Sequence, residues 1–362
     1  MVRTAQNKIF IFREGEKVQI EAYGEHIIRV RASKGEIENL NWTLLPPKED
    51  RASVSEEGDN VVLENGGIRA VVSSDGKISF KNQAGEVLFE ELWRNERDID
   101  ARVLRGHVGG SSHIELHLRQ YAGEHFYGLG QEAHDLFDLK GATLDLCQQN
   151  TKSTIPFVMS SRGYGFIWNN PAIGRVEFGT SGTRWVAESA RQMDYLVIAG
   201  DTPGEIEHRY CEVTGYAPEF PEWATGLWQS KLRYETQNEL MEVAREYKKR
   251  GITPSIIVCD YFHWPQQGEW KFDKKYWPEP EKMVKELNEM GIRLLVSIWP
   301  TVDPRSENFI EMRDQNMLIR SERGPGTLMY CRGPETYYDP TNPEARKFVW
   351  NKAKENYYNL GI

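Results

Sequence analysis

The sequence predicts two domains, an antiparallel β-sandwich over residues 1–220 and the first part of a (β/α)8 barrel over residues 221–362. Three observations lead to this prediction. With 362 residues, the chain is longer than a single hydrophobic core usually serves. Its first part carries short apolar segments separated by turn residues, without helical periodicity between them. Beyond Pro221, strand-like and helix-like segments alternate.

The first domain is expected to consist of strands. Asp75-Gly76 lies between two apolar segments, and this dipeptide is one of the strongest sequence signals for a hairpin. Strands at such short spacing are typical of a sandwich of antiparallel sheets. The segments predicted as strands include Val18–Ala22, Ile27–Val30, Val61–Leu63, Ile68–Val72, Ile78–Phe80 and Val87–Phe89.

The second domain shows a repeated strand–helix pattern. Its first two helices carry apolar residues at helical spacing, and each is followed by Gly-Ile, at Gly251 and Gly291. Parallel crossovers of this kind build either an open doubly wound sheet or a closed barrel. No G-x-G-x-x-G follows the first strand, so the barrel is favoured. The predicted elements are strand Thr225–Ser230, helix Thr236–Arg250, strand Ser255–Cys259, helix Pro280–Met290 and strand Leu294–Ile298.

A third repeat closes the sequence. A short helix is predicted at Asn308–Gln315, and Asn342-Pro343-Glu344 begins a longer one with a capping residue, a proline and an acid in the first turn. This helix also leads to a Gly-Ile pair, Gly361-Ile362. Because three parallel strands cannot close into a barrel, we expect the sequence to be truncated before a fourth strand.

Charge and hydropathy exclude several classes of partner. The net charge is -9 and the isoelectric point is about 5.6, so neither nucleic acid nor an anionic membrane is expected as the main partner. No apolar run approaches the roughly 20 residues that cross a bilayer. Residues 1–13 lack the apolar segment of a signal peptide. We therefore expect a cytoplasmic protein.

No metal or other cofactor is expected. The four cysteines are scattered without a C-x-x-C pair, which suits a reduced compartment better than a zinc site. His113 and His117 alternate with apolar residues, which predicts a strand that holds the two histidines roughly 13 Å apart. At that separation they cannot share a metal ion.

The candidate site follows from the predicted strands. In a (β/α)8 barrel, chemistry takes place at the C-terminal ends of the strands. Asp260 directly follows a strand of buried β-branched residues. A carboxylate there must face the barrel mouth or be paired within the protein. Two alternatives remain, ligand binding and an ion pair with a neighbouring Arg or Lys, and ligand binding is favoured.

Aromatic residues surround the same strand ends. Trp264 and Trp299 follow the second and third strands, and Trp270 lies in the loop after the second. A flat apolar ring matches the C–H face of a pyranose, but the same rings can simply close the barrel. Trp270 is a candidate for an outer sugar subsite. His263 is interpreted as an ordinary loop residue.

The motifs resemble glycoside hydrolase family 31 over nearly the whole chain and in the same order. Within that family, the sequence around Phe262 is most similar to that of bacterial α-xylosidases. The motifs that carry the resemblance are Phe126-Tyr127-Gly128-Leu129-Gly130-Gln131-Glu132, Asp260-Tyr261-Phe262-His263-Trp264, Trp270-Lys271-Phe272-Asp273, Tyr276-Trp277-Pro278-Glu279-Pro280, Ser297-Ile298-Trp299-Pro300 and Tyr338-Asp339-Pro340-Thr341-Asn342-Pro343-Glu344-Ala345-Arg346.

The resemblance implies a galactose-mutarotase-like sandwich followed by a catalytic barrel. It also implies metal-independent, retaining hydrolysis of a terminal α-linked sugar through a glycosyl-enzyme intermediate. Such chemistry needs two carboxylates roughly 5 Å apart, one as nucleophile and one as general acid/base. In this family the nucleophile ends the fourth strand, which is expected shortly after Ile362. No catalytic residue is therefore expected in this chain.

The resemblance also implies roles for residues that are present. Asp260 matches the aspartate that binds sugar hydroxyls in the −1 subsite, and Trp299 matches an aromatic wall of that subsite. Phe262, Trp264 and Trp270 are further expected substrate contacts. Arg233 lies where the first barrel loop reaches the site, a position at which the family varies.

The expected activity is that of an α-xylosidase or a closely related α-glucosidase, with an oligosaccharide or α-glycoside as substrate. This chain alone is expected to be inactive. A homo-oligomer is one possible assembly of the full-length protein. A rival interpretation is a non-catalytic carbohydrate-binding remnant. That rival is disfavoured because three barrel strands alone would expose a long parallel edge.

Overall fold

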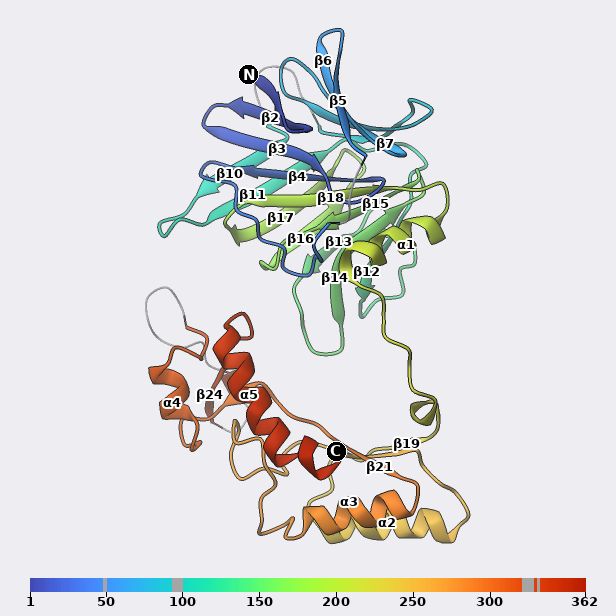
Figure 1. Cartoon of the computed structure of the whole chain (residues 1–362), viewed down its shortest axis with the longest axis vertical. Coiled ribbons are helices and arrows are strands. Elements are labelled where there is room, and N and C mark those ends of the chain that lie inside the picture. The colour runs from blue at the N-terminus through green and yellow to red at the C-terminus, as the bar shows by residue number, and fades with distance from the viewer. Residues whose placement is uncertain (48–50, 93–99, 321–328, 331–332) are drawn as a thin grey trace. The chain divides into compact units, whose positions relative to one another are not determined.

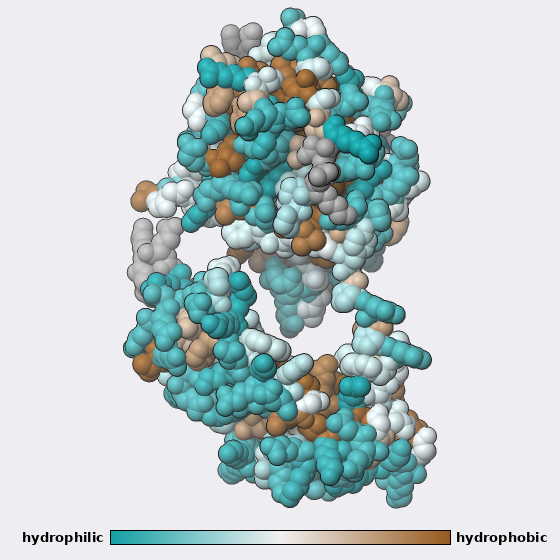
Figure 2. Space-filling model, in the orientation of Figure 1, coloured by the Kyte–Doolittle hydropathy of each residue, from teal (hydrophilic) through white to brown (hydrophobic). Residues whose placement is uncertain are grey.

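The computed structural model describes residues 1–47, 51–92, 100–320, 329–330 and 333–362. Its internal contacts divide the chain into two compact units, Met1–Ala217 and Pro218–Ile362. Figure 1 shows the first unit as layered strands, coloured blue to green, and the second as a mixture of strands and helices, coloured yellow to red. Polar residues cover most of the face seen in Figure 2. No helix among the described residues has the length and apolar character needed to span a membrane.

The sandwich of the first unit consists of an eight-stranded and a five-stranded antiparallel sheet. In spatial order, the larger sheet holds β1 (Val2–Ala5), β2 (Lys8–Arg13), β3 (Glu16–Ala22), β4 (Ile27–Ser33), β18 (Met193–Ala199), β15 (Tyr164–Trp168), β14 (Ser153–Ser160) and β12 (Phe126–Gln131). The smaller sheet holds β10 (Arg102–Gly106), β11 (Ser112–Leu118), β17 (Thr183–Ala190), β16 (Gly174–Phe178) and β13 (Thr143–Leu146).

A third antiparallel sheet covers the sandwich and shares its core. Its strands follow chain order as β5 (Ser53–Glu57), β6 (Asn60–Asn65), β7 (Ile68–Val72), β8 (Ile78–Asn82) and β9 (Val87–Glu90). The hairpin predicted at Asp75-Gly76 joins β7 to β8, and Gly76 takes the left-handed φ of 91°. One hydrophobic cluster joins Phe80 of β8, Trp185 of β17 and Val197 of β18. All three sheets therefore share one core.

The first unit also contains a helix, α1 (Pro203–Thr214), which the prediction of an all-strand domain missed. The Thr202 hydroxyl accepts a hydrogen bond from the Glu205 N–H at 3.3 Å, and Pro203 occupies the first turn. Ile206 and Val213 pack against the sheet face that β18 turns away from the main core. This helix explains why β18 is buried on both faces.

The second unit begins a parallel sheet of the predicted kind. Its strands pair in the order β19 (Trp228–Gln229), β20 (Ile256–Cys259) and β21 (Arg293–Val296), each parallel to the next. Between them lie α2 (Gln237–Lys249) and α3 (Pro280–Glu289). The glycine after each helix, Gly251 or Gly291, has a left-handed φ of 71° or 81°. Figure 1 shows α2 and α3 side by side, and Leu240 and Leu287 pack in one core cluster.

The first strand is shorter than predicted. Residues Glu222–Thr225 form a 3₁₀ turn, η1, and only Trp228–Gln229 pair with β20. The backbone approaches its neighbour closely here, because a Cβ on Gly226 would lie 1.9 Å from the Ser255 hydroxyl. The predicted strand Thr225–Ser230 is therefore too long at both ends.

After β21 the chain forms a small antiparallel sheet and two helices. The sheet consists of β22 (Thr301–Val302), β24 (Pro334–Tyr337) and β23 (Met329–Tyr330). The short helix predicted near residue 310 is α4 (Phe309–Asp314). The long one is α5 (Pro343–Asn356), capped by the Asn342 side chain, and it continues into the 3₁₀ turn η2 (Tyr358–Leu360).

Candidate functional site

The ends of β20 and β21 lie side by side. The Ser297 N–H, just past β21, donates a hydrogen bond of 3.0 Å to the carbonyl of Cys259, the last residue of β20. Asp260 therefore starts its loop at the same edge from which Trp299 emerges. Its carboxylate is partly buried, and Oδ1 accepts the Tyr261 N–H at 2.8 Å. Among the described Arg and Lys residues, none forms an ion pair with Asp260, so the ion-pair alternative has no support there.

Four aromatic rings cluster on the loops that follow β20 and β21. The Phe262 ring lies 5.5 Å from Trp299 and 5.9 Å from Trp264, centroid to centroid, and Tyr261 lies 5.3 Å from Trp299. Trp264 is 6% exposed and forms the back of the cluster. Tyr261, Phe262 and Trp299 keep partly exposed surfaces that a sugar ring can contact.

Arg233 brings the first strand end to the same place. It lies four residues past β19, and its guanidinium carbon is 5.9 Å from the centroid of the Phe262 ring. Its Nη2 also donates to the Glu235 carboxylate at 3.0 Å. The structure thus brings together Asp260, Phe262, Trp264, Trp299 and Arg233, hereafter the strand-edge site.

Trp270 lies elsewhere than predicted for a sugar contact. Its side chain is 1% exposed and packs in the core of the second unit, where its ring meets Tyr338 edge-on. Its indole N–H donates to the carbonyl of Trp299 at 2.9 Å. A role in an outer subsite stays a prediction. The observed position supports a different role, in which Trp270 holds the backbone of Trp299.

Backbone strain is concentrated at these residues. Arg233, Phe262 and Trp270 have φ values of 64°, 62° and 44°, in the left-handed region that bulky residues rarely adopt. Asn316, at 56°, is the fourth described non-glycine residue of the second unit in that region. Each such residue costs about 1–3 kcal/mol, and such strain tends to cluster at functional sites.

His263 is the residue that sequence reasoning undervalued. Its ring is 1% exposed, with Nδ1 3.0 Å from the Asp260 carbonyl oxygen and Nε2 2.9 Å from the Tyr357 hydroxyl. Burial lowers the pKa of His263 to about 4. The partner Tyr357 is 94 residues away, and no local sequence signal announces a contact of that range.

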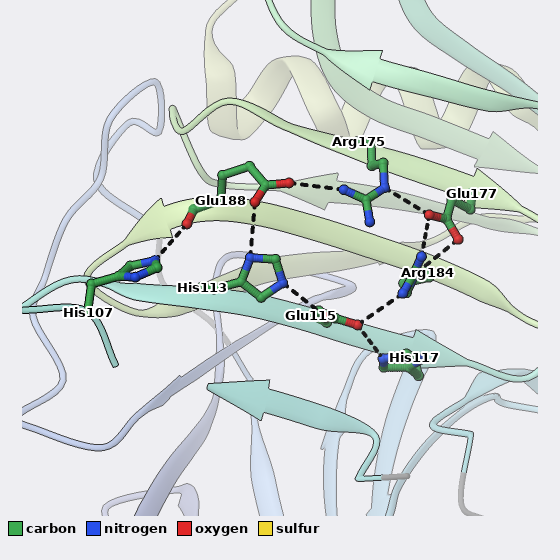
Figure 3. A network of polar contacts seen from close by, with 8 residues as sticks. All are labelled: His107, His113, Glu115, His117, Arg175, Glu177, Arg184 and Glu188. Atoms are coloured by element: carbon green, nitrogen blue, oxygen red, sulfur yellow. Dashed lines mark hydrogen bonds and ion pairs between the residues drawn. The ribbon is translucent and has the colours of Figure 1, made fainter. Parts of the chain in front are cut away.

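A second polar cluster lies on the smaller sheet of the sandwich, as Figure 3 shows. Glu115 of β11 lies between two histidines, with 3.0 Å to His113 Nε2 and 3.0 Å to His117 Nε2. Burial opposes ionisation of Glu115, but hydrogen bonds from both histidines outweigh it, and its pKa lies below the ordinary value. This set, hereafter the β11 network, comprises His107, His113, Glu115, His117, Arg175, Glu177, Arg184 and Glu188.

Comparison with known proteins identifies the family. The N-terminal galactose mutarotase-like domain of glycosyl hydrolase 31 matches residues 17–177, and the glycosyl hydrolases family 31 TIM-barrel domain matches residues 217–362. Over 96% of its length, the chain is 40% identical to an uncharacterized family 31 glucosidase, ORF2, of Pseudescherichia vulneris, and it covers 70% of that protein. The chain belongs to glycoside hydrolase family 31.

Other relatives of the chain are named α-xylosidases. An α-xylosidase of Saccharolobus solfataricus is 31% identical over 95% of the chain, which covers 46% of that protein. The crystal structure of an α-xylosidase from a soil metagenome, in complex with xylose, superposes on the whole chain with a TM-score of 0.96 and 45% identity. The chain covers 56% of that structure. It thus spans about half the length of these two relatives.

These findings confirm the predicted fold class. A mutarotase-like β-sandwich precedes part of a TIM-barrel domain, and the parallel sheet of that second part is not closed among the described residues. They also confirm the resemblance to family 31 that the motifs indicated.

Proposed function

We propose that this chain supplies one wall of the sugar-binding pocket of a retaining α-glycosidase. The observation that carries the proposal is the convergence of Asp260, Phe262 and Trp299 at the C-terminal edge of the parallel sheet, where barrel enzymes bind their substrates. Asp260 has no described cationic partner to satisfy it. Its free oxygen is therefore available to sugar hydroxyls.

The residues of the strand-edge site divide the work of recognition. The Asp260 carboxylate accepts hydrogen bonds from hydroxyl groups of the sugar, and charge-assisted bonds of this kind are stronger than neutral ones. The rings of Phe262 and Trp299 cover an apolar face of the same sugar. Trp264 backs these rings, and Arg233 adds a donor at the rim. The strained backbone at Phe262 and Arg233 supports a site held in a fixed shape.

The reacting groups are proposed to lie on segments that follow Ile362. Retaining hydrolysis needs a nucleophilic carboxylate and an acid/base carboxylate roughly 5 Å apart. Family 31 places the nucleophile at the end of the fourth barrel strand. In this proposal, Asp260 binds the sugar and does not react with it. The 362-residue chain by itself is expected to hydrolyse no α-glycoside, and measurable turnover would contradict this placement of the nucleophile.

The proposed substrate is a terminal α-xyloside. Support comes from the named α-xylosidases among the relatives and from the 45% identical structure that was solved with xylose. An α-glucoside is the second candidate, because the Pseudescherichia relative is named a glucosidase. The two sugars differ at C5, where glucose carries a CH₂OH group and xylose does not.

A paired assay tests the proposal. The protein encoded by the complete reading frame is purified, and kcat/KM is measured for p-nitrophenyl α-xyloside and p-nitrophenyl α-glucoside. The α-xyloside is expected to be the better substrate, and the sugar is expected to be released with retained anomeric configuration. Preference for the α-glucoside would favour the second candidate. Sugar binding without hydrolysis of either substrate would instead favour a non-catalytic carbohydrate-binding protein.

A further inference from the structure

We propose that His263 is a positioning residue, whose ring joins the Asp260 carbonyl to the Tyr357 hydroxyl and so fixes the turn that presents Asp260 and Phe262. This inference rests on the proposed function of the strand-edge site. His263 itself is 1% exposed and is placed to act through its neighbours, not on the sugar.

The two contacts define a single tautomer of the His263 ring. A carbonyl oxygen only accepts hydrogen bonds, so Nδ1 of His263 carries the proton in the 3.0 Å contact with Asp260. Nε2 is then the acceptor for the Tyr357 hydroxyl at 2.9 Å. Burial lowers the pKa of His263 to about 4, which keeps the ring neutral, and burial raises the pKa of Tyr357, which keeps its hydroxyl protonated.

The bond from Nδ1 closes a strained turn. Between Asp260 and His263 the chain passes through Phe262, whose φ of 62° an aromatic residue rarely adopts. The peptide groups on either side are held as well. The Asp260 carboxylate accepts the Tyr261 N–H at 2.8 Å, and the His263 carbonyl accepts the Asp273 N–H at 2.7 Å. The side chain of His263 thus holds a turn in which the backbone conformation of Phe262 is unfavourable.

Aromatic side chains enclose the ring. Its centroid lies 4.8 Å from Trp264, 5.0 Å from Phe272 and 5.6 Å from Tyr357. Because the enclosed residue is 1% exposed, bulk water does not compete for either hydrogen bond, and the geometry of the turn depends on the ring itself.

The contact with Tyr357 connects His263 to a distant part of the chain. Tyr357 is the C-cap residue of α5, and four residues separate it from Ile362. Under the proposed function, the segment beyond leads to the strand that carries the nucleophile. The bridge therefore links the sugar-binding turn to the segment that enters the next strand, and its loss is expected to shift the two relative to each other.

Three variants of the complete protein test this role. Asn places an amide nitrogen near the position of Nδ1, whereas Gln places its amide near Nε2. His263→Asn keeps the contact with the Asp260 carbonyl but loses the one with Tyr357, so its kcat/KM on p-nitrophenyl α-xyloside is expected to fall only about fivefold, as in Tyr357→Phe. His263→Gln is expected to lose on the order of 10- to 100-fold, because small displacements of groups that bind the reacting sugar have large kinetic effects. Tyr357→Phe removes a single oxygen, and its kcat/KM is expected to fall about fivefold.

Thermal unfolding of each variant separates positioning from stability. Unchanged kcat/KM in all three variants, whether or not their melting temperatures fall, would overturn the positioning role. An equal loss in His263→Asn and His263→Gln would also overturn it, because the Asp260 carbonyl would then not be the contact that counts. If the His263 variants fail to fold, Tyr357→Phe decides the question alone. A wild-type protein without activity on any α-glycoside would instead overturn the proposed function.

Discussion

The strand-edge site and the β11 network contain similar residue types, but they differ in whether their carboxylates are paired within the protein. In the β11 network each carboxylate contacts an arginine or a histidine, and Glu115 alone is within 3.3 Å of His113, His117 and Arg184. In the strand-edge site, Asp260 forms no ion pair with any described residue, and its neighbours carry strained backbones. Internal pairing leaves little for a ligand, whereas an unpaired carboxylate on a rigid, strained frame is available to one.

The histidines make the same contrast. His263 contacts a backbone carbonyl and a hydroxyl inside an aromatic enclosure, and it stays neutral. His117 contacts a carboxylate, and burial still lowers its pKa against the opposing effect of Glu115. The nature of the partner therefore sets what each histidine does. Substitutions in the strand-edge site should alter activity, and substitutions in the β11 network should alter stability only.

After the loss of the Asp260 charge, removing an aromatic wall should give the largest effect. Trp299→Ala is expected to lower kcat/KM of the complete protein by about 10- to 100-fold, since a ring that covers a ligand contributes about 1–3 kcal/mol. Trp350→Ala serves as the matched control, because Trp350 is 53% exposed on α5. Steady-state kinetics of both variants provide the measurement. Equal losses of kcat/KM in the two variants would contradict a role of Trp299 in binding the sugar.

Acid should destabilise the wild-type protein more than a His263 variant. A histidine whose folded pKa is about 4 and whose ordinary value is 6.5 favours the unfolded state as pH falls below 6.5. Between pH 7 and pH 5 the wild type should lose about 2 kcal/mol of unfolding free energy that His263→Asn does not lose. Urea denaturation of both proteins at each pH measures the difference. Parallel losses would show that His263 is not buried as described.

The smallest effect is expected in the β11 network. Glu115→Gln should lower the unfolding free energy at pH 7 by about 1–2 kcal/mol, because a buried acceptor of charged donors is weakened. Glu188→Gln, at a side chain that is 49% exposed, should change it by less than about 0.5 kcal/mol. Because the folded pKa of Glu115 is lowered, the deficit of Glu115→Gln should shrink as pH falls below about 4.5.

Kinetics of the same two glutamate variants sharpen the comparison. Both are expected to keep the wild-type kcat/KM on p-nitrophenyl α-xyloside, since no step of the proposed function uses the β11 network. A large loss of activity in Glu115→Gln, at unchanged stability, would contradict the division between the two regions.

The fold was readable from local sequence patterns. Helical spacing, caps and the glycines at 251 and 291 predicted α2 and α3, and β-branched residues predicted β20. The same cap signals, Thr202 followed by Pro203, were present before α1 but stood inside a region dominated by strands. The length of β19 was not predictable, because neither the 3₁₀ turn at Glu222–Thr225 nor the close approach of Gly226 to Ser255 has a local sequence signal.

The candidate site was readable only in part. The position of Asp260 and Trp299 at strand ends followed from the strands themselves. The burial of Trp270 did not, because it depends on a hydrogen bond to the Trp299 carbonyl that only the folded loop creates. The bridge from His263 to Tyr357 joins residues far apart in the chain, and the left-handed φ of Phe262 has no signature in an aromatic residue.

The central claim is that Asp260 binds the sugar, and one substitution tests it most directly. In the complete protein, Asp260→Asn is expected to lower kcat/KM on p-nitrophenyl α-xyloside on the order of 100-fold, because it removes charge from hydrogen bonds to the substrate. Asp314→Asn, at an exposed aspartate on α4, is expected to match the wild type. Equal activity of Asp260→Asn and wild type, with both proteins folded, would contradict the claim.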